Sequence, residues 1–243
     1  MMRLDRYLVT LGVGTRTEVQ KLIRAGGVEA EGTVCRDPGQ QLREGASLRV
    51  RGEALDTRLM RHVMLNKPAG LLTAARDRKQ PTVMGLLPPA YAALSCMPVG
   101  RLDKDTTGLL LLSCDGELNH RLLSPARHVD KTYRAVVDGP LTGAEVAAFA
   151  TGVALSDFTA LPARLEILSS SAEESVARVT VREGKFHQIK RMFEAVGRQV
   201  TALHREAFGP LTLDAGLAPG QWRELTAEEA RALYEAAQME VHQ

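Results

Sequence analysis

The segment GRLDKDTTGLLLLS, residues 100–113, decides the fold, because a turn crowded with charge runs directly into a row of leucines. Consecutive large apolar residues are typical of a strand buried on both faces, so we expect a central strand over 108–113. The turn before it carries two carboxylates, Asp103 and Asp105, and two cations. A solvated loop holds such a mixture as readily as a functional site does, and this segment alone leaves both interpretations open.

Asp103 and Asp105 also raise a glycosidase-like hypothesis, since residues two apart in an extended segment lie on one face. A pair of carboxylates so placed can serve as general acid and general base. Such pairs normally come from separate segments, and nothing else in the sequence indicates sugar chemistry. Locally, the alternatives are this acid–base pair and a charged turn capped by Thr106-Thr107-Gly108.

The rest of the chain predicts an α+β fold with a largely antiparallel sheet. Strand patterns are numerous, helical patterns are fewer, and the two do not alternate regularly. The expected strands lie at 62–65, 108–113, 132–137, 176–181 and 211–213. The expected helices lie at 187–197 and at 226–237, the second of which opens with a capping box of Thr226 and Glu229.

The first sixty residues have the pattern of a small α/β module. A first helix is indicated by apolar residues at helical spacing: Leu4, Tyr7, Leu8 and Leu11. A second helix begins at a capping box of Thr15 and Glu18. Short strands are expected around 28–30 and 47–50, followed by a linker over 53–61. We therefore predict two domains, 1–60 and 61–243.

The net charge of +2 is unevenly distributed. Residues 1–62 hold eleven Lys/Arg and eight Asp/Glu, a balance of +3, whereas the remainder holds twenty and twenty-one, a balance of −1. A basic module on a neutral body suggests a polyanion as its partner. With the apolar stripes inward, the cations expected to project outward are Arg3, Arg6, Arg16, Lys21 and Arg24.

Several classes of protein are disfavoured. Cys35, Cys96 and Cys114 are far apart and in no ligand spacing, so we expect reduced thiols and no metal site. Neither GxxxxGK[ST] nor GxGxxG occurs, so we expect no nucleotide cofactor. Early charges disfavour a signal peptide, and no apolar run approaches the ~20 residues of a membrane helix. We expect a cytoplasmic protein with no membrane contact.

The helix expected at 187–197 has two faces. Opposite its apolar stripe lie His187, Lys190, Arg191 and Glu194. A solvated polar face explains this pattern when the helix is considered alone. The alternative is that the helix presents a cation into a groove.

Together, the motifs resemble those of the RNA pseudouridine synthases, in the RsuA branch of ribosomal small-subunit enzymes. GRLDKDTTGLLLL is similar to the family signature. Further similar segments follow the same order: MLNKPAG at 64–70, SPARHVDKTY at 124–133, EGKFHQIKRMFEAVG at 183–197, LHREAFG at 203–209 and LAPGQWRELT at 217–226. The front end resembles an S4 RNA-binding module through RLDRYL at 3–8, TR at 15–16 and IRAGGVEAEG at 23–32. Thr15 and Glu31 depart from the usual Ser and Asn.

The resemblance implies a reaction and its site residues. These enzymes break the C1′–N1 bond of a uridine in RNA, turn the uracil and rejoin it through C5, without cofactor or metal. Asp103 corresponds to their essential carboxylate, acting as nucleophile or as proton-abstracting base. The supporting residues implied are Lys190 as its cationic partner, Tyr133 stacking on the uracil, Leu203 on the other side, and Arg101 filling the space of the extruded base.

Other motif residues have less defined roles. Asp105 is expected to form the turn, and Lys67 and Asn66 to shape the neighbouring loop. His204 and Arg205 have two open interpretations, phosphate binding and a structural role.

The expected substrate is a uridine in 16S rRNA, free or in a small-subunit assembly intermediate, because the motifs look closer to the small-subunit branch than to its large-subunit relatives. We expect the protein to act as a monomer. One alternative is the same chemistry on 23S rRNA. Another is a non-catalytic RNA-binding ribosome-assembly factor, which the intact Asp103, Tyr133 and Lys190 disfavour.

Overall fold

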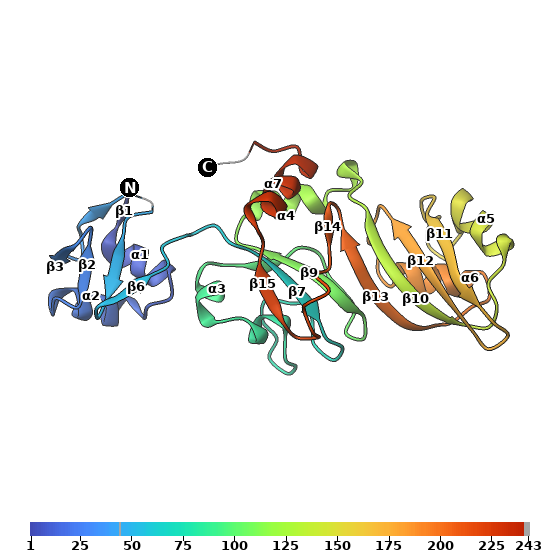
Figure 1. Ribbon diagram of the computed structural model, residues 1–243, viewed down its shortest axis with the longest axis horizontal. Helices are drawn as coiled ribbons and strands as arrows, with labels where there is room; N and C mark the ends of the chain where they lie inside the picture. Colours follow the sequence, from blue (N-terminus) through green and yellow to red (C-terminus); the bar gives the residue numbers. More distant parts are fainter. Residues whose placement is uncertain (44, 241–243) are drawn as a thin grey trace. The chain divides into compact units, whose positions relative to one another are not determined.

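A computed structural model describes residues 1–43 and 45–240 (Figure 1). The chain forms two compact units. One comprises Met1–Arg61 and Leu87–Met97, and the other comprises His62–Leu86 and Pro98–Gln243. The last of the three boundaries falls within the short strand β8 (Met97–Pro98). The helix α3 (Pro89–Ala93) therefore belongs to the first unit.

The first unit combines helices with two small sheets. Helices α1 (Leu4–Thr10) and α2 (Arg16–Arg24) bury their predicted apolar stripes. The predicted capping box is present, since the amide of Thr15 donates to the Glu18 carboxylate at 2.8 Å. One sheet pairs β1 (Met2–Arg3) with β4 (Gln41–Leu42). The other is antiparallel in the order β3 (Thr33–Cys35), β2 (Val28–Ala30), β5 (Leu48–Val50) and β6 (Glu53–Leu55).

The start of the expected linker is part of this sheet. Strand β6 pairs with β5 in an antiparallel hairpin, so the linker prediction is wrong for 53–55. The hairpin is closed by Arg51 and Gly52, which have φ angles of 52° and 85°. Two consecutive residues with positive φ suit the twist of a two-residue hairpin loop, and Arg51 gave no sequence signal for it.

The second unit is built on one large sheet. Its strands follow the order β11 (Arg164–Ser170), β12 (Glu174–Val181), β10 (Lys131–Asp138), β13 (Val200–Phe208), β9 (Thr107–Ser113), β7 (His62–Lys67) and β15 (Trp222–Glu224), with β14 (Leu211–Thr212) paired to β13. The pairings are antiparallel except that of β13 with β9, which is parallel. The predicted α+β class with a mainly antiparallel sheet is confirmed.

Helices pack on this sheet in two groups (Figure 1). Helices α4 (Gly116–Leu123) and α7 (Ala227–Ala236) share an apolar core with β7 and β9 that includes Met64, Leu111 and Leu233. Helix α5 (Gly143–Thr151) packs against β11, and α6 (Gln188–Ala195) packs against β13. The short 3-10 helices are η1 (Val83–Leu86) and η2 (Pro125–Arg127).

The cysteines differ from the sequence expectation. Cys35 is a free, buried thiol, whereas Cys96 and Cys114 are disulfide-bonded. The expectation of three reduced thiols is therefore wrong, because disulfide formation depends on distance in the fold and not on spacing along the chain.

Among the described residues, no helix combines the length and the apolar character that crossing a membrane requires.

Candidate active site

The parallel pairing of β9 with β13 brings the charged turn to the middle of the large sheet. Arg205 on β13 lies opposite Gly108 on β9. Gly108 has a φ angle of +99°, and a Cβ atom there would lie 2.3 Å from the carbonyl oxygen of Arg205. Glycine is therefore required both by the backbone conformation and by the close approach of the strands. This contact fixes the turn that ends at Thr106 directly beside β13.

Lys67, at the end of β7, holds the backbone of the turn. Its side chain is fully buried, and Nζ lies 2.9–3.2 Å from the carbonyl oxygens of Pro68, Asp103, Lys104 and Thr106. Burial lowers the pKa of the Lys67 ammonium to about 8, although the nearby carboxylates of Asp105 and Asp103 favour its charged form. Lys67 thus has the loop-shaping role that we expected of it.

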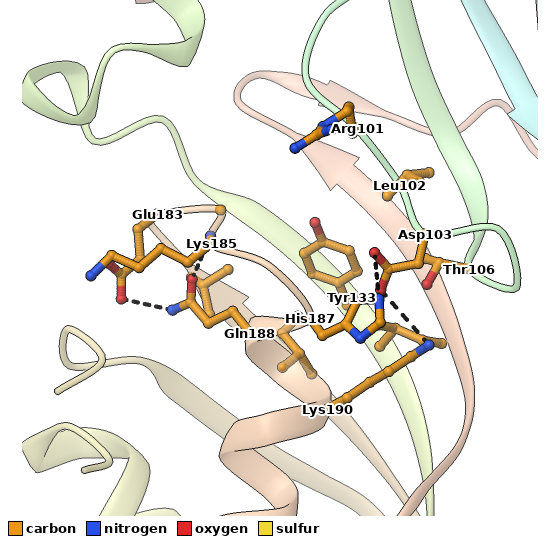
Figure 2. Close-up of a pocket in the computed structure, with 14 residues that line it drawn as sticks. Arg101, Leu102, Asp103, Thr106, Tyr133, Glu183, Lys185, His187, Gln188 and Lys190 are labelled. Carbon is orange, nitrogen blue, oxygen red and sulfur yellow. Dashed lines mark hydrogen bonds and ion pairs between the residues drawn. The ribbon is translucent and has the colours of Figure 1, made fainter. Parts of the chain in front are cut away.

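Asp103 faces two basic side chains at the start of α6 (Figure 2). Nε2 of His187 lies 3.5 Å from its Oδ1, and Nζ of Lys190 lies 3.7 Å from its Oδ2. His187 precedes α6 in the left-handed conformation, with φ of 49°, and its ring stacks on Phe186. Both distances exceed those of good hydrogen bonds, and 29% of the Asp103 side chain is exposed. The carboxylate is therefore near two basic side chains yet open to a ligand.

Lys190 is shared between two carboxylates. Its Nζ donates to both oxygens of Asp105 at 2.7 Å, which is 1 Å closer than its approach to Asp103. This hydrogen bond lowers the pKa of Asp105 below its ordinary value, against the opposing effect of burial. Asp105 is thus the tighter partner of Lys190 as well as a residue of the turn.

A pocket over Asp103 brings together all the residues predicted for the catalytic site. Arg101, Asp103, Tyr133, Lys190 and Leu203 all line it (Figure 2). Tyr133 comes from β10 and Leu203 from β13, and each is 8% exposed. A planar ligand in this pocket has an aromatic ring, an aliphatic side chain and a carboxylate available to it.

The basic residues predicted for RNA contact lie in the first unit. All are exposed: Arg3, Arg6, Arg16, Lys21 and Arg24. Arg3 also hydrogen-bonds to the buried carboxylate of Asp5, with Nε 3.0 Å from Oδ1. Hydrogen bonding by Arg3 is the largest effect holding the pKa of Asp5 well below its usual range. Arg3 therefore has a structural partner, whichever ligand the surface binds.

The surroundings of two pocket residues, His187 and Thr106, were not predicted. His187 had been placed on the polar face of its helix, where spacing gave no sign that it approaches Asp103. Thr106 is 2% exposed, and its Oγ1 has no hydrogen-bond partner in the part of the chain that the structure describes. The signal available for both was adjacency, since His187 precedes Lys190 in the HQIK motif and Thr106 follows the charged turn.

The polar groups of the pocket suit organic acid–base and nucleophilic chemistry. An ionised carboxylate can attack an electrophilic carbon or accept a proton. Over 1–43 and 45–240, no group of three or more His, Cys, Asp or Glu side chains could hold a metal ion.

Comparisons with known proteins agree with this geometry. Residues 61–195 match the family model described as RNA pseudouridylate synthase, and residues 2–48 match the S4 domain. The chain is 41% identical to the Bacillus subtilis (strain 168) protein called uncharacterized RNA pseudouridine synthase YtzG, over 96% of this chain and 99% of that one. It is 42% identical to ribosomal small subunit pseudouridine synthase A of Yersinia pestis, over 94% and 96% of the two chains. A solved structure described as a pseudouridylate synthase is 34% identical, with a TM-score of 0.66 over 96% of this chain and 100% of that chain.

Proposed function

Because the chain belongs to the RNA pseudouridylate synthase family, we propose that it converts a specific uridine of 16S rRNA to pseudouridine, with Asp103 as the essential carboxylate. The observation that carries this proposal is the position of Asp103, whose carboxylate faces a pocket lined by Tyr133 and Leu203 and lies 3.7 Å from Lys190. A base bound between these side chains would present its glycosidic carbon to the carboxylate.

Asp103 performs the first step by one of two routes. As a nucleophile it attacks C1′ while the C1′–N1 bond breaks, and as a base it removes a sugar proton so that uracil leaves by elimination. In the nucleophilic route the uracil turns and its C5 displaces the Asp103 carboxylate from C1′, which breaks the bond to Asp103. In the elimination route the turned uracil adds to C1′ through C5, and Asp103 returns the abstracted proton to the sugar. The proton of C5 is then lost and N1 gains one, so the isomerisation balances without a co-reactant. Lys190 and His187, at 3.7 Å and 3.5 Å, are the basic side chains that face this carboxylate.

Tyr133, Leu203 and Arg101 position the nucleotide. A flat aromatic face tolerates rotation of the base that stacks on it, which suits Tyr133 to a reaction in which the uracil turns. Leu203 packs on the other side of the base. Arg101 is exposed at the mouth of the pocket, where it can occupy the place of the extruded uridine.

The small-subunit substrate is proposed from the names of the relatives and from the motifs. Residues 1–60 would act as the RNA-binding domain and 61–243 as the catalytic domain. The exposed cations of the first unit would contact phosphates without reading sequence, while the pocket reads an unstacked uridine. We propose a cytoplasmic monomer that acts on rRNA or on a small-subunit assembly intermediate.

Asp103→Asn tests the chemistry. The variant should lose at least about 1000-fold in the rate of pseudouridine formation on 16S rRNA, because an amide neither attacks C1′ nor accepts a proton efficiently. Its RNA affinity and its unfolding midpoint should stay near those of the unmodified protein. Asp105→Asn is the matched control and should retain substantially more activity. Pseudouridine formation by Asp103→Asn at the normal rate would overturn the assignment.

Mapping pseudouridines in rRNA from cells that lack the gene tests the substrate. Loss of one 16S signal is expected. Loss of a 23S signal instead would keep the chemistry and overturn the choice of subunit. Unchanged rRNA would favour a non-catalytic assembly factor.

A further inference from the structure

We propose that a cavity beside the catalytic pocket binds a phosphate of the RNA backbone next to the target uridine, through the buried side chains of Lys131 and Arg205. The identification of the ligand as RNA rests on the proposed function. The existence of an anion site rests on the side chains themselves, so the two can fail separately.

The cavity adjoins the catalytic pocket and has a volume of about 290 Å³. The two share five lining residues: Arg101, Tyr133, Glu183, Gly184 and Lys185. Lys131, Arg205 and Phe208 line the cavity but not the pocket over Asp103. Tyr133 thus lines both the pocket over Asp103 and this cavity, so a group bound here would lie next to the nucleotide site.

Lys131 is a buried cation without a salt bridge among the residues that the structure describes. Only 8% of the residue is exposed, and Nζ donates to the carbonyl oxygen of Val129 at 2.8 Å. The carboxylate next to it in sequence, Asp130, is engaged by Arg182, whose Nε lies 3.0 Å from its Oδ1. Burial lowers the pKa of Lys131 to about 8, and repulsion from Arg205 acts in the same direction.

Arg205 is more deeply buried and is incompletely bonded. It is 1% exposed, and its Nε donates to the carbonyl oxygen of Leu109 at 2.6 Å. Its Nη2 is buried and has no hydrogen-bond partner within 1–43 and 45–240. The guanidinium carbon lies 6.0 Å from the ring centre of Tyr133 and 5.2 Å from that of Phe208, so aromatic faces offset part of its charge.

Two adjacent buried cations are unfavourable unless an anion compensates them. Glu183 also lines the cavity, but its carboxylate already accepts from the side chain of Gln188 at 2.7 Å and from the amide of Leu161 at 2.8 Å. A phosphodiester supplies the missing charge, and its oxygens suit a guanidinium and an ammonium together. Arg101 and Arg182, both exposed, add positive charge at the cavity. This arrangement selects the phosphate-binding interpretation of Arg205 over the purely structural one.

The first test uses inorganic phosphate as the probe and needs no catalysis. Thermal unfolding of the full chain is compared in sodium phosphate and in sodium chloride of equal ionic strength. Phosphate should raise the midpoint of the unmodified protein by about 2–4 °C more than that of Lys131→Met. Lys79→Met removes an exposed lysine outside both cavities and should behave as the unmodified protein. Lys131→Arg keeps the charge and should keep the phosphate response. Equal stabilisation of Lys131→Met and the unmodified protein would overturn the site.

The second test uses RNA. An oligonucleotide containing the target uridine is made with a neutral methylphosphonate at each flanking position in turn. At one position the substitution should weaken binding by about 10–100-fold for the unmodified protein and by less than about 2-fold for Lys131→Met. The slope of log affinity against log salt should also fall by about 1 for the variant. Equal losses for both proteins at every position would contradict the proposal. Phosphate binding by a protein that forms no pseudouridine in any rRNA would overturn the proposed function and leave the anion site supported.

Discussion

The paired strands β7 and β9 carry a polar cluster at each end, and the two clusters differ in how fully their groups are bonded. At one end, the closed cluster, Tyr234 donates to the carboxylate of Asp115 at 2.8 Å, and Nδ1 of His62 lies 2.9 Å from Oγ of Ser113. All four residues are at most 9% exposed. Burial lowers the pKa of His62, which favours the neutral ring.

At the other end, the open cluster, the backbone of the turn accepts hydrogen bonds from Lys67, but the Asp103 carboxylate has no short hydrogen bond to a basic side chain that the structure describes. Lys67 binds main-chain carbonyls, whereas the Asp103 carboxylate lies 3.5 Å from His187 and 3.7 Å from Lys190 and is partly exposed. The same kinds of side chain therefore serve different purposes on one pair of strands. Saturated hydrogen bonds make the closed cluster structural, while the unsaturated carboxylate keeps the open cluster available to a substrate.

Of the substitutions that test the difference between the two clusters, Lys67→Met should change stability and activity the most. The change removes the donor for four carbonyl oxygens, so we expect a loss of about 3 kcal/mol in the free energy of unfolding and about a 100-fold loss of activity from a displaced turn. Urea unfolding and single-turnover modification rates measure the two effects. Lys104→Met is the control, since its Nζ donates to Gln80 at the surface and its loss should cost under about 0.5 kcal/mol. An active, stable Lys67→Met variant would show that the turn keeps its conformation without the hydrogen bonds of Lys67.

Asp115→Ala, in the closed cluster, should lower stability without lowering activity. The side chain caps α4 through the amides of Glu117 and Leu118, and it accepts from Tyr234. We expect a loss of about 2–3 kcal/mol of stability with the modification rate unchanged at a temperature where the variant is folded. Chemical unfolding and single-turnover rates test this. A selective loss of rate would mean that the two ends of the strands are functionally coupled.

The pH dependence of stability should distinguish Lys67 from an ordinary lysine. Its pKa is about 8 in the folded protein, against 10.5 for an ordinary lysine side chain. Between these values the unfolded chain holds more protons, so the stability contributed by this residue rises with pH. From pH 7 to pH 9.5 the unmodified protein should gain about 1–2 kcal/mol relative to Lys67→Met. A difference that stays constant over this range would contradict the lowered pKa.

The smallest expected effect is that of Tyr234→Phe. The change removes one hydrogen bond to Asp115 from a cluster whose other bonds remain, and should cost about 1 kcal/mol. Burial and this bond raise the pKa of Tyr234, so no ionised form complicates measurements below pH 9. Thermal unfolding is sufficient to detect the change. Activity lost in step with temperature-dependent unfolding alone would confirm a structural role.

The fold could be predicted where local signals were strong. The buried strand after the charged turn and the capping boxes at Thr15 and Thr226 were found from pattern alone. Helix α5 was missed although Thr142 and Glu145 form a capping box, because its alanine-rich sequence has no clear apolar face. Strand β13 was missed because it alternates charged and apolar residues within a motif that we considered only for function.

The predicted catalytic residues proved to line one pocket, but their partners could not be predicted. The sharing of Lys190 between Asp103 and Asp105, and the approach of His187, depend on the parallel contact of β9 with β13. Such contacts join residues nearly a hundred positions apart, and no spacing along the chain encodes them. The cavity at Lys131 could not be predicted for the same reason. Nothing in the KTY motif indicates that its lysine is buried.

The hydrogen bonds of Lys67 to the backbone have a consequence for the evolution and engineering of this turn. Lys67 binds the carbonyl groups of Pro68, Asp103, Lys104 and Thr106, which every residue type possesses. These four contacts therefore do not depend on which side chain stands at the accepting positions. Position 104 should tolerate most substitutions, and a library randomised at this position should contain many active variants. A library randomised at position 67, which no motif marks as catalytic in this chain, should contain almost no active variant other than the one with lysine.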